Sequence, residues 1–304
     1  MSGADHPHEF DQIERLFRPL TRGAPEALNL LDDAAVIPSR PGFDLVVTKD
    51  AMVEGVHFLP GEDLEVVARR LLRVNLSDLA AKGAEPYGYF LAVAWTPSCG
   101  WAAREAFARG LALDGAAFDL SLLGGDTVST AGPLTVTATV LGWAPKGGAV
   151  LRRGARAGDL LLVSGPVGQG ALGLMAAQGR LPDPHGSLAR HFRLPEPRLD
   201  LREKLRRHAS ASADVSDGLI ADAGHLARAS GLALEIDLDR MPLSAAAQAW
   251  VAAQDDRTEA LLILASGGDD YELVIAAAPD AVAALDLPVI GRFKAGEGVC
   301  ATID

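Results

Sequence analysis

The chain is poor in cysteine, with only Cys99 and Cys300 among its 304 residues. Two cysteines so far apart form neither a disulfide framework nor the spacing of a metal site. No apolar run reaches about 18 residues, the length that a membrane-spanning helix needs, and no basic segment followed by an apolar one opens the chain. We therefore expect a soluble protein in the cytoplasm.

Three widespread catalytic motifs are also missing: the Walker A phosphate loop, the G-x-S-x-G elbow and the H-E-x-x-H helix. Their absence excludes the usual NTPases, serine hydrolases and zinc proteases. Residues 165–170 (GPVGQG) resemble half of a dinucleotide fingerprint, but the glycine spacing differs and no acid stands at the expected offset. We interpret this segment as a turn that begins a helix.

Positive charge is scarce, with 28 Lys and Arg against 40 Asp and Glu and a net charge of -12. Such a surface repels nucleic acid and anionic lipid, which argues against a polyanion-binding scaffold. An anionic substrate must therefore arrive with metal ions or meet a local basic cluster. Arg152 and Arg153 form such a cluster, either as phosphate-binding guanidinium groups or as a solvated linker patch.

Acidic residues, by contrast, recur in short segments, most of them where an apolar run ends. The segments are Asp32-Asp33, Asp50 with Glu54, Asp78, Gly124-Gly125-Asp126, Asp214-Val215-Ser216-Asp217 and Gly267-Gly268-Asp269-Asp270. Converging carboxylates repel one another unless cations lie between them, and Mg2+ prefers a few carboxylates together with substrate phosphates. The pattern indicates phosphoryl transfer through metal ions without a phosphate-cradling loop.

Hydrophobic periodicity predicts helices that alternate with strands in both halves of the chain. The predicted helices are 10–20, 63–81, 101–113, 168–178, 198–208, 217–230 and 243–253, and the predicted strands are 44–48, 88–95, 120–123, 134–143, 160–164, 232–238, 261–265 and 271–276. The length suggests two domains. We place them at 1–146 and 147–304, each a mixed α/β layer structure.

Some of the acidic segments have an ordinary structural explanation. Asp32-Asp33 can cap or close a turn, and Asp50 can do the same at the end of its strand. His57, in the loop after that strand, can be a packed or surface histidine. The functional alternative is a metal ligand at Asp50 and a phosphate contact at His57.

Two further segments are ambiguous to different degrees. Asn75 and Asp78 lie one turn apart on a predicted helix among small apolar residues. A carboxylate buried there is costly unless it is paired or bound to a metal ion, which favours a functional role for Asp78. In Gly124-Gly125-Asp126 the glycines let backbone N–H groups approach a ligand that Asp126 faces; the alternative is a tight turn capped by the Asp.

The last two segments lie in the second half of the chain. Asp214-Val215-Ser216-Asp217 precedes a predicted helix, whose N-terminus favours phosphate. Ser216 or Asp217 can be the N-cap, but a second neighbouring carboxylate costs repulsion unless a cation is present, which favours function. Residues 266–273 (SGGDDYEL) are predicted to be a glycine turn between two strands, either an exposed hairpin or a ligand site.

The order of these segments resembles the thiamine-monophosphate kinases. The matching motifs are Asp32-Asp33, Thr48-Lys49-Asp50, Gly55-Val56-His57-Phe58, NLSDLAAKGA (75–84), GGDT (124–127), DVSDGL (214–219) and SGGDDYEL (266–273). This family belongs with aminoimidazole ribonucleotide synthetase, selenophosphate synthetase and the hydrogenase maturation dehydratase. Its members use ATP and Mg2+ to convert thiamine monophosphate into thiamine diphosphate, and the resemblance implies the same reaction here.

The resemblance also implies roles for individual residues, carried over motif by motif. Metal positions would be Asp33, Thr48, Lys49, Asp50, Asp78, Asp126, Asp214 and Asp217, for several Mg2+ ions. ATP would contact Gly125, Asp126, Arg152 and Ser216. His57 and Asp269 would contact thiamine monophosphate, and Asp126 and Asp217 would be catalytic.

The implied architecture is the two-domain fold of the aminoimidazole ribonucleotide synthetase-like proteins, of mixed α/β (α+β) class. Residues 1–146 would bind ATP and metal and pair their sheet with that of a second subunit, forming a barrel in a homodimer. Residues 147–304 would form an α/β domain, with ATP between the domains. No nucleic acid or membrane is expected as a partner.

The sequence departs from the family pattern at two site positions. Lys49 replaces a small hydroxyl residue, so only its backbone carbonyl can ligate Mg2+. Asp269 stands where the family usually has Glu, which shortens the substrate contact by one methylene. Asp304 is not followed by the family's aromatic tail, so stacking on the thiamine rings is expected to come from elsewhere or to be missing.

Two other functions remain open from the sequence. One is a related ATP-using enzyme of the same superfamily with another acceptor. The other is a nucleotide-binding protein that has lost turnover, which Lys49 and the short C-terminal segment suggest.

Overall fold

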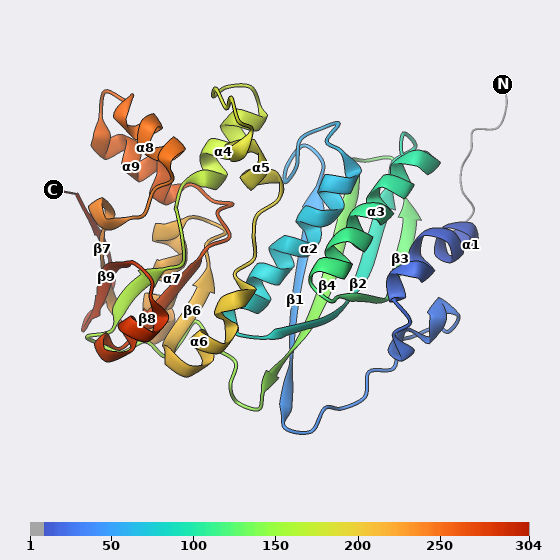
Figure 1. Cartoon of the computed structure of the whole chain (residues 1–304), viewed down its shortest axis with the longest axis horizontal. Coiled ribbons are helices and arrows are strands. Elements are labelled where there is room, and N and C mark those ends of the chain that lie inside the picture. Colours follow the sequence, from blue (N-terminus) through green and yellow to red (C-terminus); the bar gives the residue numbers. More distant parts are fainter. Residues whose placement is uncertain (1–8, 304) are drawn as a thin grey trace. The chain divides into compact units, whose positions relative to one another are not determined.

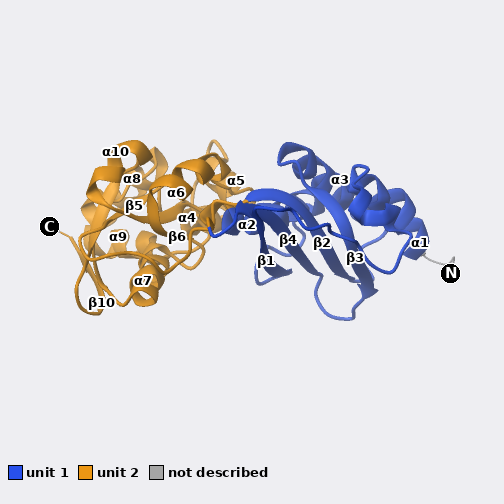
Figure 2. Cartoon of the chain, turned by 90° about the horizontal axis from the view of Figure 1, so that it is seen from below, with its two compact units in different colours: residues 1–79, 85–147 blue, residues 80–84, 148–304 orange. Residues whose placement is uncertain are grey.

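The computed structural model describes residues 9–303 and divides into two compact units (Figure 2). Unit 1 comprises the residues up to 79 together with 85–147, and unit 2 comprises 80–84 and 148–304. Each unit contains its own sheet and its own helices, which confirms the predicted mixed α/β class. In the part of the chain that is described, no helix is long and apolar enough to cross a membrane.

Unit 1 is built on a four-stranded sheet with the order β1-β4-β2-β3 (Figure 1). The strands are β1 (Phe43–Val53), β2 (Glu85–Trp95), β3 (Ser121–Ser129) and β4 (Thr135–Pro145). β4 pairs antiparallel with both β1 and β2, whereas β2 and β3 run parallel. Parallel neighbours need a crossover, and α3 (Trp101–Ala117) provides it between β2 and β3.

Two long helices cover one face of this sheet, α3 and α2 (Leu64–Ala81) (Figures 1 and 2). Asp114 of α3 joins them, because its buried carboxylate accepts hydrogen bonds from Arg69 and Arg73 of α2. Gly110 lets the helices approach, since a Cβ there would lie 2.2 Å from the carbonyl oxygen of Glu65. The periodicity that predicted both helices is therefore the pattern of their buried faces.

The first predicted helix, 10–20, is only partly correct. The segment consists of α1 (Glu9–Gln12), a π-helical turn (Ile13–Phe17) and a 3-10 turn (Arg18–Thr21). Pro19 lacks a backbone N–H and so cannot continue an α-helical hydrogen-bond ladder. Leu16, Phe17 and Leu20 are nevertheless buried, so the predicted apolar face is correct.

The predicted end of a strand at Gly124-Gly125-Asp126 is wrong. β3 continues through these residues to Ser129, beside β2. A Cβ on Gly125 would lie 1.9 Å from the carbonyl oxygen of Leu91, so the glycine permits the close approach of two strands rather than a turn.

Unit 2 contains a six-stranded sheet with the order β10-β7-β9-β5-β8-β6. Its strands are β5 (Leu160–Val163), β6 (Ala209–Asp214), β7 (Ala233–Asp237), β8 (Leu273–Ala277), β9 (Val289–Lys294) and β10 (Gly298–Thr302). Only β10 and β7 pair in parallel. The strand at 209–214 escaped prediction because its Ala and Ser residues have low strand propensity.

Helices cover both faces of this sheet. They are α4 (Gln169–Ala177), α5 (Ser187–Arg193), α6 (Arg202–His208), α7 (Leu219–Ser230), α8 (Ala245–Ala252), α9 (Arg257–Ser266) and α10 (Val282–Leu285). In β8, Val274 packs in a core cluster with Leu219 of α7, and Ile275 packs in a second cluster with Leu205 of α6. The sheet is thus the middle layer of unit 2.

The predicted strand at 261–265 is also wrong, because these residues lie in α9. Leu261 and Leu264 are buried and face the core of the unit. A short apolar run cannot distinguish a buried helical turn from a strand. The glycine turn that follows therefore joins a helix to β8 rather than two strands.

Candidate functional site

Unit 1 contains a pocket of about 520 Å3 against the edge strand β3. It is lined by Glu9, Ile13, Phe17, Ala27, Leu30, Asp32, Asp33, Ala34, Ala35, Phe90, Leu91, Leu122, Leu123, Gly124, Gly125, Asp126 and Thr127. Three predicted site residues, Asp33, Gly125 and Asp126, are among them. A pocket of this size with apolar walls and a few polar groups is suited to a small ligand.

The β3 wall of the pocket has little side-chain bulk. Gly124 and Gly125 expose backbone there, and the carboxylate of Asp126 is exposed, with one oxygen accepting the N–H of Thr127 at 2.8 Å. The hydroxyl of Thr127 in turn accepts the indole N–H of Trp95 at 2.9 Å. This wall offers backbone groups and one carboxylate to a ligand.

Asp32 and Asp33 both line the pocket, but among the described residues only the Asp32 carboxylate has a hydrogen bond to the local backbone. One oxygen of Asp32 accepts the N–H of the adjacent residue Asp33 at 2.8 Å, so the Asp32 carboxylate has a local backbone contact. Both residues are exposed at the pocket, and Asp33 is the one that the family pattern assigns to a metal ion.

A second group of predicted residues in unit 1 joins β1 to α2. The hydroxyl of Thr48 donates a hydrogen bond to the carboxylate of Asp78. Burial, reinforced by the charge of Asp78, raises the pKa of Asp50 to about 6. Two carboxylates and a hydroxyl are hard oxygen donors of the kind that Mg2+ binds.

Lys49 lies between Thr48 and Asp50 in β1. Successive side chains in a strand point to opposite faces, so the Lys49 side chain points away from Thr48 and Asp50 and is exposed. It cannot interpose its charge between Asp50 and Asp78. Only its backbone carbonyl can contribute to a site there.

His57 is not brought to the pocket. It is exposed in the turn after β1, where its Nδ1 accepts the backbone N–H of Val53 at 3.1 Å. The structure therefore gives His57 a local contact, and its role toward a substrate stays a prediction.

In unit 2, two predicted segments form a single hydrogen-bonded loop pair. The N–H of Asp269 donates to the carbonyl of Ser216 at 2.9 Å, and the N–H of Tyr271 donates to that of Val215 at 2.8 Å. Gly268 is required at this crossing, since a Cβ there would lie 2.3 Å from the Ser216 oxygen. The pairing brings the predicted nucleotide residue Ser216 beside the predicted substrate residue Asp269.

Asp214 and Asp217 flank this crossing but differ in exposure. Asp214 is the last residue of β6 and is buried, whereas Asp217 is exposed. The interpretation of Ser216 or Asp217 as the N-cap of α7 is wrong, because Gly218 occupies that position without a side-chain cap. Instead, Asp222 in the first turn accepts the N–H groups of both Ser216 and Asp217 at 2.9 Å.

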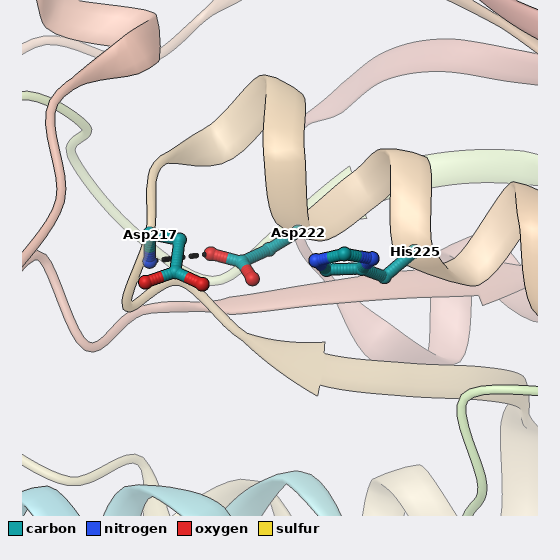
Figure 3. Close-up of side chains that lie close together, drawn as sticks. All are labelled: Asp217, Asp222 and His225. Atoms are coloured by element: carbon teal, nitrogen blue, oxygen red, sulfur yellow. Dashed lines mark hydrogen bonds between the residues drawn. The ribbon is translucent and has the colours of Figure 1, made fainter.

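Figure 3 shows Asp217, Asp222 and His225 together at the start of α7. One donor atom from each lies within 4.8 Å of the others, a geometry that could hold a metal ion. Burial raises the pKa of Asp222, and the charge of Asp217 adds to the effect. Asp222 and His225 had no motif to mark them, because their role depends on contacts that the local sequence does not encode.

The acids of the SGGDDYEL segment divide between two roles. Asp270 is buried and accepts the N–H groups of Gly168 and Gly170 at 2.7 and 2.8 Å, where α4 begins. This confirms that residues 165–170 are a helix-start turn. Glu272, also buried, accepts Arg198 Nε at 2.7 Å. Both acids are structural.

Asp269 and Tyr271 alternate with those buried acids and are more exposed. The Tyr271 hydroxyl donates to the Asp269 carboxylate at 3.1 Å. Both residues have positive φ, 67° and 51°, a strained conformation for residues with a side chain. Such strain is typical of a functional site, and the sequence did not single out Tyr271.

Arg152 is exposed in the segment before β5, next to β6. The N–H of Ser212 in β6 donates to the carbonyl of Leu151 at 3.1 Å, and β6 ends at Asp214. Arg152 therefore stands within unit 2 beside the strand that leads into the loop 214–218.

The comparisons with known proteins agree with this geometry. The N-terminal domain of the AIR synthase related proteins matches residues 31–144, and their C-terminal domain matches residues 156–301. The thiamine-monophosphate kinase of Caulobacter vibrioides is 61% identical over 304 residues, covering 97% of this chain and 86% of that protein.

Solved structures agree as well. The crystal structure of thiamine-monophosphate kinase from Stenotrophomonas maltophilia has a TM-score of 0.84 at 37% identity, and the match covers 97% of this chain and 98% of that one. A structure of AaThiL complexed with AMPPCP and TMP has a TM-score of 0.79 at 29% identity, covering 89% and 87% of the two chains.

Proposed function

We propose, since this chain belongs to the AIR synthase related proteins and among them to the thiamine-monophosphate kinases, that it phosphorylates thiamine monophosphate with ATP. The observation that carries the proposal is the 61% identity to the Caulobacter vibrioides enzyme over 97% of this chain. The complex of AaThiL with AMPPCP, an ATP analogue, and TMP supports both substrates. The product is thiamine diphosphate, for thiamine diphosphate biosynthesis.

The pocket in unit 1 supports a nucleotide-binding role. Its walls include Phe17 and Leu123, which can pack against a base, while Gly125 and Asp126 offer backbone and a carboxylate for the phosphate end. Arg152 and Ser216 of unit 2 are proposed as further ATP contacts. Arg152 would supply a guanidinium for phosphate, and Ser216 lies at the exposed loop before α7.

Magnesium is proposed as the metal, in several sites. Asp50, Asp78 and the Thr48 hydroxyl fit it, because burial beside a second carboxylate makes the ionised form of Asp50 costly in the absence of a cation. Asp33, Asp126, Asp214, Asp217 and the Lys49 carbonyl complete the proposed ligands. When bound, Mg2+ offsets the repulsion between the two anionic substrates.

The mechanism that we propose is direct in-line transfer. A phosphate oxygen of thiamine monophosphate forms a bond to the γ-phosphorus of ATP, while the bond between that phosphorus and the β–γ bridging oxygen breaks and ADP leaves. The attacking oxygen is already anionic near pH 7, so no strong general base is needed. Asp126 and Asp217 hold the reacting groups in line, and no phospho-enzyme forms.

For thiamine monophosphate we propose contacts from His57 and Asp269. Tyr271 supports this role for Asp269, because its hydroxyl holds that carboxylate at 3.1 Å. The hydrogen bond orients a carboxylate that is one methylene shorter than the Glu usual in the family.

We also propose a homodimer formed through unit 1. Leu45 and Val47 of β1 are 41% and 54% exposed and lie on the same face as Lys49, opposite the helices. Exposed apolar side chains on this sheet face suit the barrel that the family forms between two subunits. Residues 1–146 would then be the domain for dimerisation and for ATP and metal binding. Residues 147–304 would form the α/β domain, which contributes Arg152, Asp214, Ser216 and Asp217. A cytoplasmic location stays a prediction from the sequence.

The test is the purified protein with ATP and Mg2+ and a panel of acceptors. We expect thiamine monophosphate to yield thiamine diphosphate, detected by chromatography, and free thiamine to yield no product. Product from another acceptor alone would favour a different enzyme of the superfamily. ATP binding without ADP production would favour a protein that has lost turnover.

A further inference from the structure

We propose that Asp222 is a positioning residue for the kinase reaction: its buried carboxylate fixes the backbone of Ser216 and Asp217 and so directs their side chains. The inference rests on the proposed function, because Ser216 and Asp217 are the proposed nucleotide and metal residues. The family resemblance assigns no role to Asp222. The carboxylate acts through the loop and does not touch a substrate.

The first observation is the hydrogen bonding. Oδ2 of Asp222 accepts the N–H groups of Ser216 and Asp217, each at 2.9 Å, from a side chain that is 1% exposed. α7 has no other side-chain cap, and its N-cap Gly218 has a φ of 115°. A single carboxylate inside the helix thus holds the loop that leads into it.

The second observation is that the loop is also held from the other side. The carbonyl of Ser216 accepts the N–H of Asp269, and Gly268 passes so close that a Cβ would lie 2.3 Å from that oxygen. Each of the two peptide units that flank Ser216 is therefore bonded to Asp222 through its N–H group and to the substrate segment through its carbonyl. A shift of this loop would move the nucleotide, metal and substrate positions of unit 2 together.

The third observation concerns charge. Oδ1 of Asp222 is buried and has no hydrogen-bond partner among residues 9–303. One carboxylate oxygen of Asp222 lies within 4.8 Å of a donor atom of Asp217 and of His225 (Figure 3). The backbone N–H of Asp217 faces Asp222, and a carboxylate oxygen of Asp217 lies within 4.8 Å of one of Asp222, so the two like charges repel unless a cation lies between them. The Asp217 carboxylate is exposed and is therefore accessible to a cation from solution.

The experiment compares Asp222→Ala and the near-isosteric Asp222→Asn with a matched control, Asp183→Ala. Asp183 also accepts two backbone N–H groups at the start of a helix in unit 2, those of Ser187 and Ala189 at 3.1 and 2.9 Å. Asp222→Ala and Asp183→Ala therefore each remove a carboxylate that binds backbone N–H groups at the start of a helix. Of the two residues, only Asp222 binds the loop 214–218.

We expect Asp222→Ala to lower kcat by at least about tenfold and to raise the Mg2+ concentration for half-maximal rate by about fivefold or more. Asp222→Asn keeps one acceptor oxygen, so its kcat and its Mg2+ concentration for half-maximal rate should lie between those of Asp222→Ala and of the wild type. Amide hydrogen exchange should accelerate in the segment 214–218 of both Asp222 variants. Asp183→Ala should leave kcat, the Mg2+ dependence and that exchange unchanged.

Two results would overturn the proposal: unchanged exchange at 214–218 in Asp222→Ala, or the same kinetics in Asp222→Ala and Asp183→Ala. A loss of Mn2+ binding in His225→Ala equal to that in Asp222→Ala would also overturn it, because Asp222 would then be a ligand. Exchange and Mn2+ binding need no turnover. If the wild type is inactive but exchange at 214–218 is faster in the Asp222 variants, the result contradicts the proposed function. The same result supports the role of Asp222 in holding the loop.

Discussion

The hydroxyl of Thr48 in β1 donates a hydrogen bond to the carboxylate of Asp78 in α2, 30 positions further along the chain. It connects two segments that the sequence marked separately as metal positions. Asp50 completes the group, with a pKa raised to about 6 by burial and by Asp78. Unit 1 thus holds two proximate carboxylates whose joint ionisation is unfavourable until a cation binds.

Replacing Asp50 by Asn should stabilise the metal-free protein. Near pH 7.5 the ionised Asp50 opposes folding, because its folded-state pKa of about 6 lies above its ordinary value of 3.8. We expect the free energy of unfolding to rise by about 1–2 kcal/mol, after allowing for solvent screening. Millimolar Mg2+ should stabilise the wild type more than the variant, as measured by thermal unfolding.

The control for that measurement is Asp255→Asn, at an exposed acid of unit 2. It should leave both the metal-free stability and the response to Mg2+ unchanged. An equal Mg2+ response in Asp50→Asn and the wild type would remove Asp50 from the metal site.

Asp270 should make the stability of the protein depend on pH. Burial raises its pKa from 3.8 to about 7, although the N–H groups of Gly170 and Gly168 act in the opposite direction. The unfolded chain therefore loses this proton first as pH rises, and the free energy of unfolding should fall between about pH 4 and pH 7, by at most about 4 kcal/mol.

The variant Asp270→Asn isolates this contribution. It has no proton to lose in that range, so its free energy of unfolding should fall less than that of the wild type between about pH 4 and pH 7. Urea unfolding at both ends of the range measures the difference. Parallel pH profiles for the two proteins would show that Asp270 is ionised in the folded state throughout.

Each of the substitutions Asp126→Asn and Asp217→Asn should abolish turnover without unfolding the protein. Both side chains are exposed, so the fold does not depend on burying them, whereas Asn lacks the charge that a metal ligand supplies. We expect at least about a hundredfold loss of kcat, equivalent to about 2.7 kcal/mol of transition-state stabilisation. Circular dichroism checks the fold, and near-wild-type activity in either variant would contradict the assignment.

Alanine at Gly125 should damage unit 1 itself. Its Cβ would lie 1.9 Å from the carbonyl oxygen of Leu91, so β2 and β3 would have to separate at the pocket wall. Overpacking of this kind costs about 1–3 kcal/mol in the free energy of unfolding, and we expect weaker ATP binding in calorimetry. Gly132→Ala is the control, since the nearest atom to its Cβ lies at 3.4 Å. Equal stability of the two variants would contradict the strand contact.

Helices and strands whose apolar residues recur at a clear helical or strand spacing could be predicted from the sequence, and the others could not. The helix predicted at 63–81 is found at Leu64–Ala81, because its apolar positions are its buried face. The strand at 209–214 and the helix at 257–266 gave no such signal, since small residues and a short apolar run fit several structures.

The same distinction holds for the site. Asp33, Gly125 and Asp126 were marked by their motifs and line one pocket. The sequence marked Asp270 as part of an acidic segment, but its structural role could not be predicted because it binds backbone N–H groups about 100 residues away. Asp222 escaped prediction because no motif shows that a carboxylate within a helix bonds back to the loop before it. An acid that holds a loop and an acid that binds a metal ion look alike in a sequence.

The most direct test of the account is phosphorus NMR of the purified protein with ATP, Mg2+ and thiamine monophosphate. It follows both reactants and both products in one sample. We predict that ADP and thiamine diphosphate appear in equal amounts, that no inorganic phosphate accumulates, and that Asp217→Asn forms neither product. ADP and inorganic phosphate without thiamine diphosphate, or no consumption of ATP by the wild type, would contradict the assignment as a thiamine-monophosphate kinase.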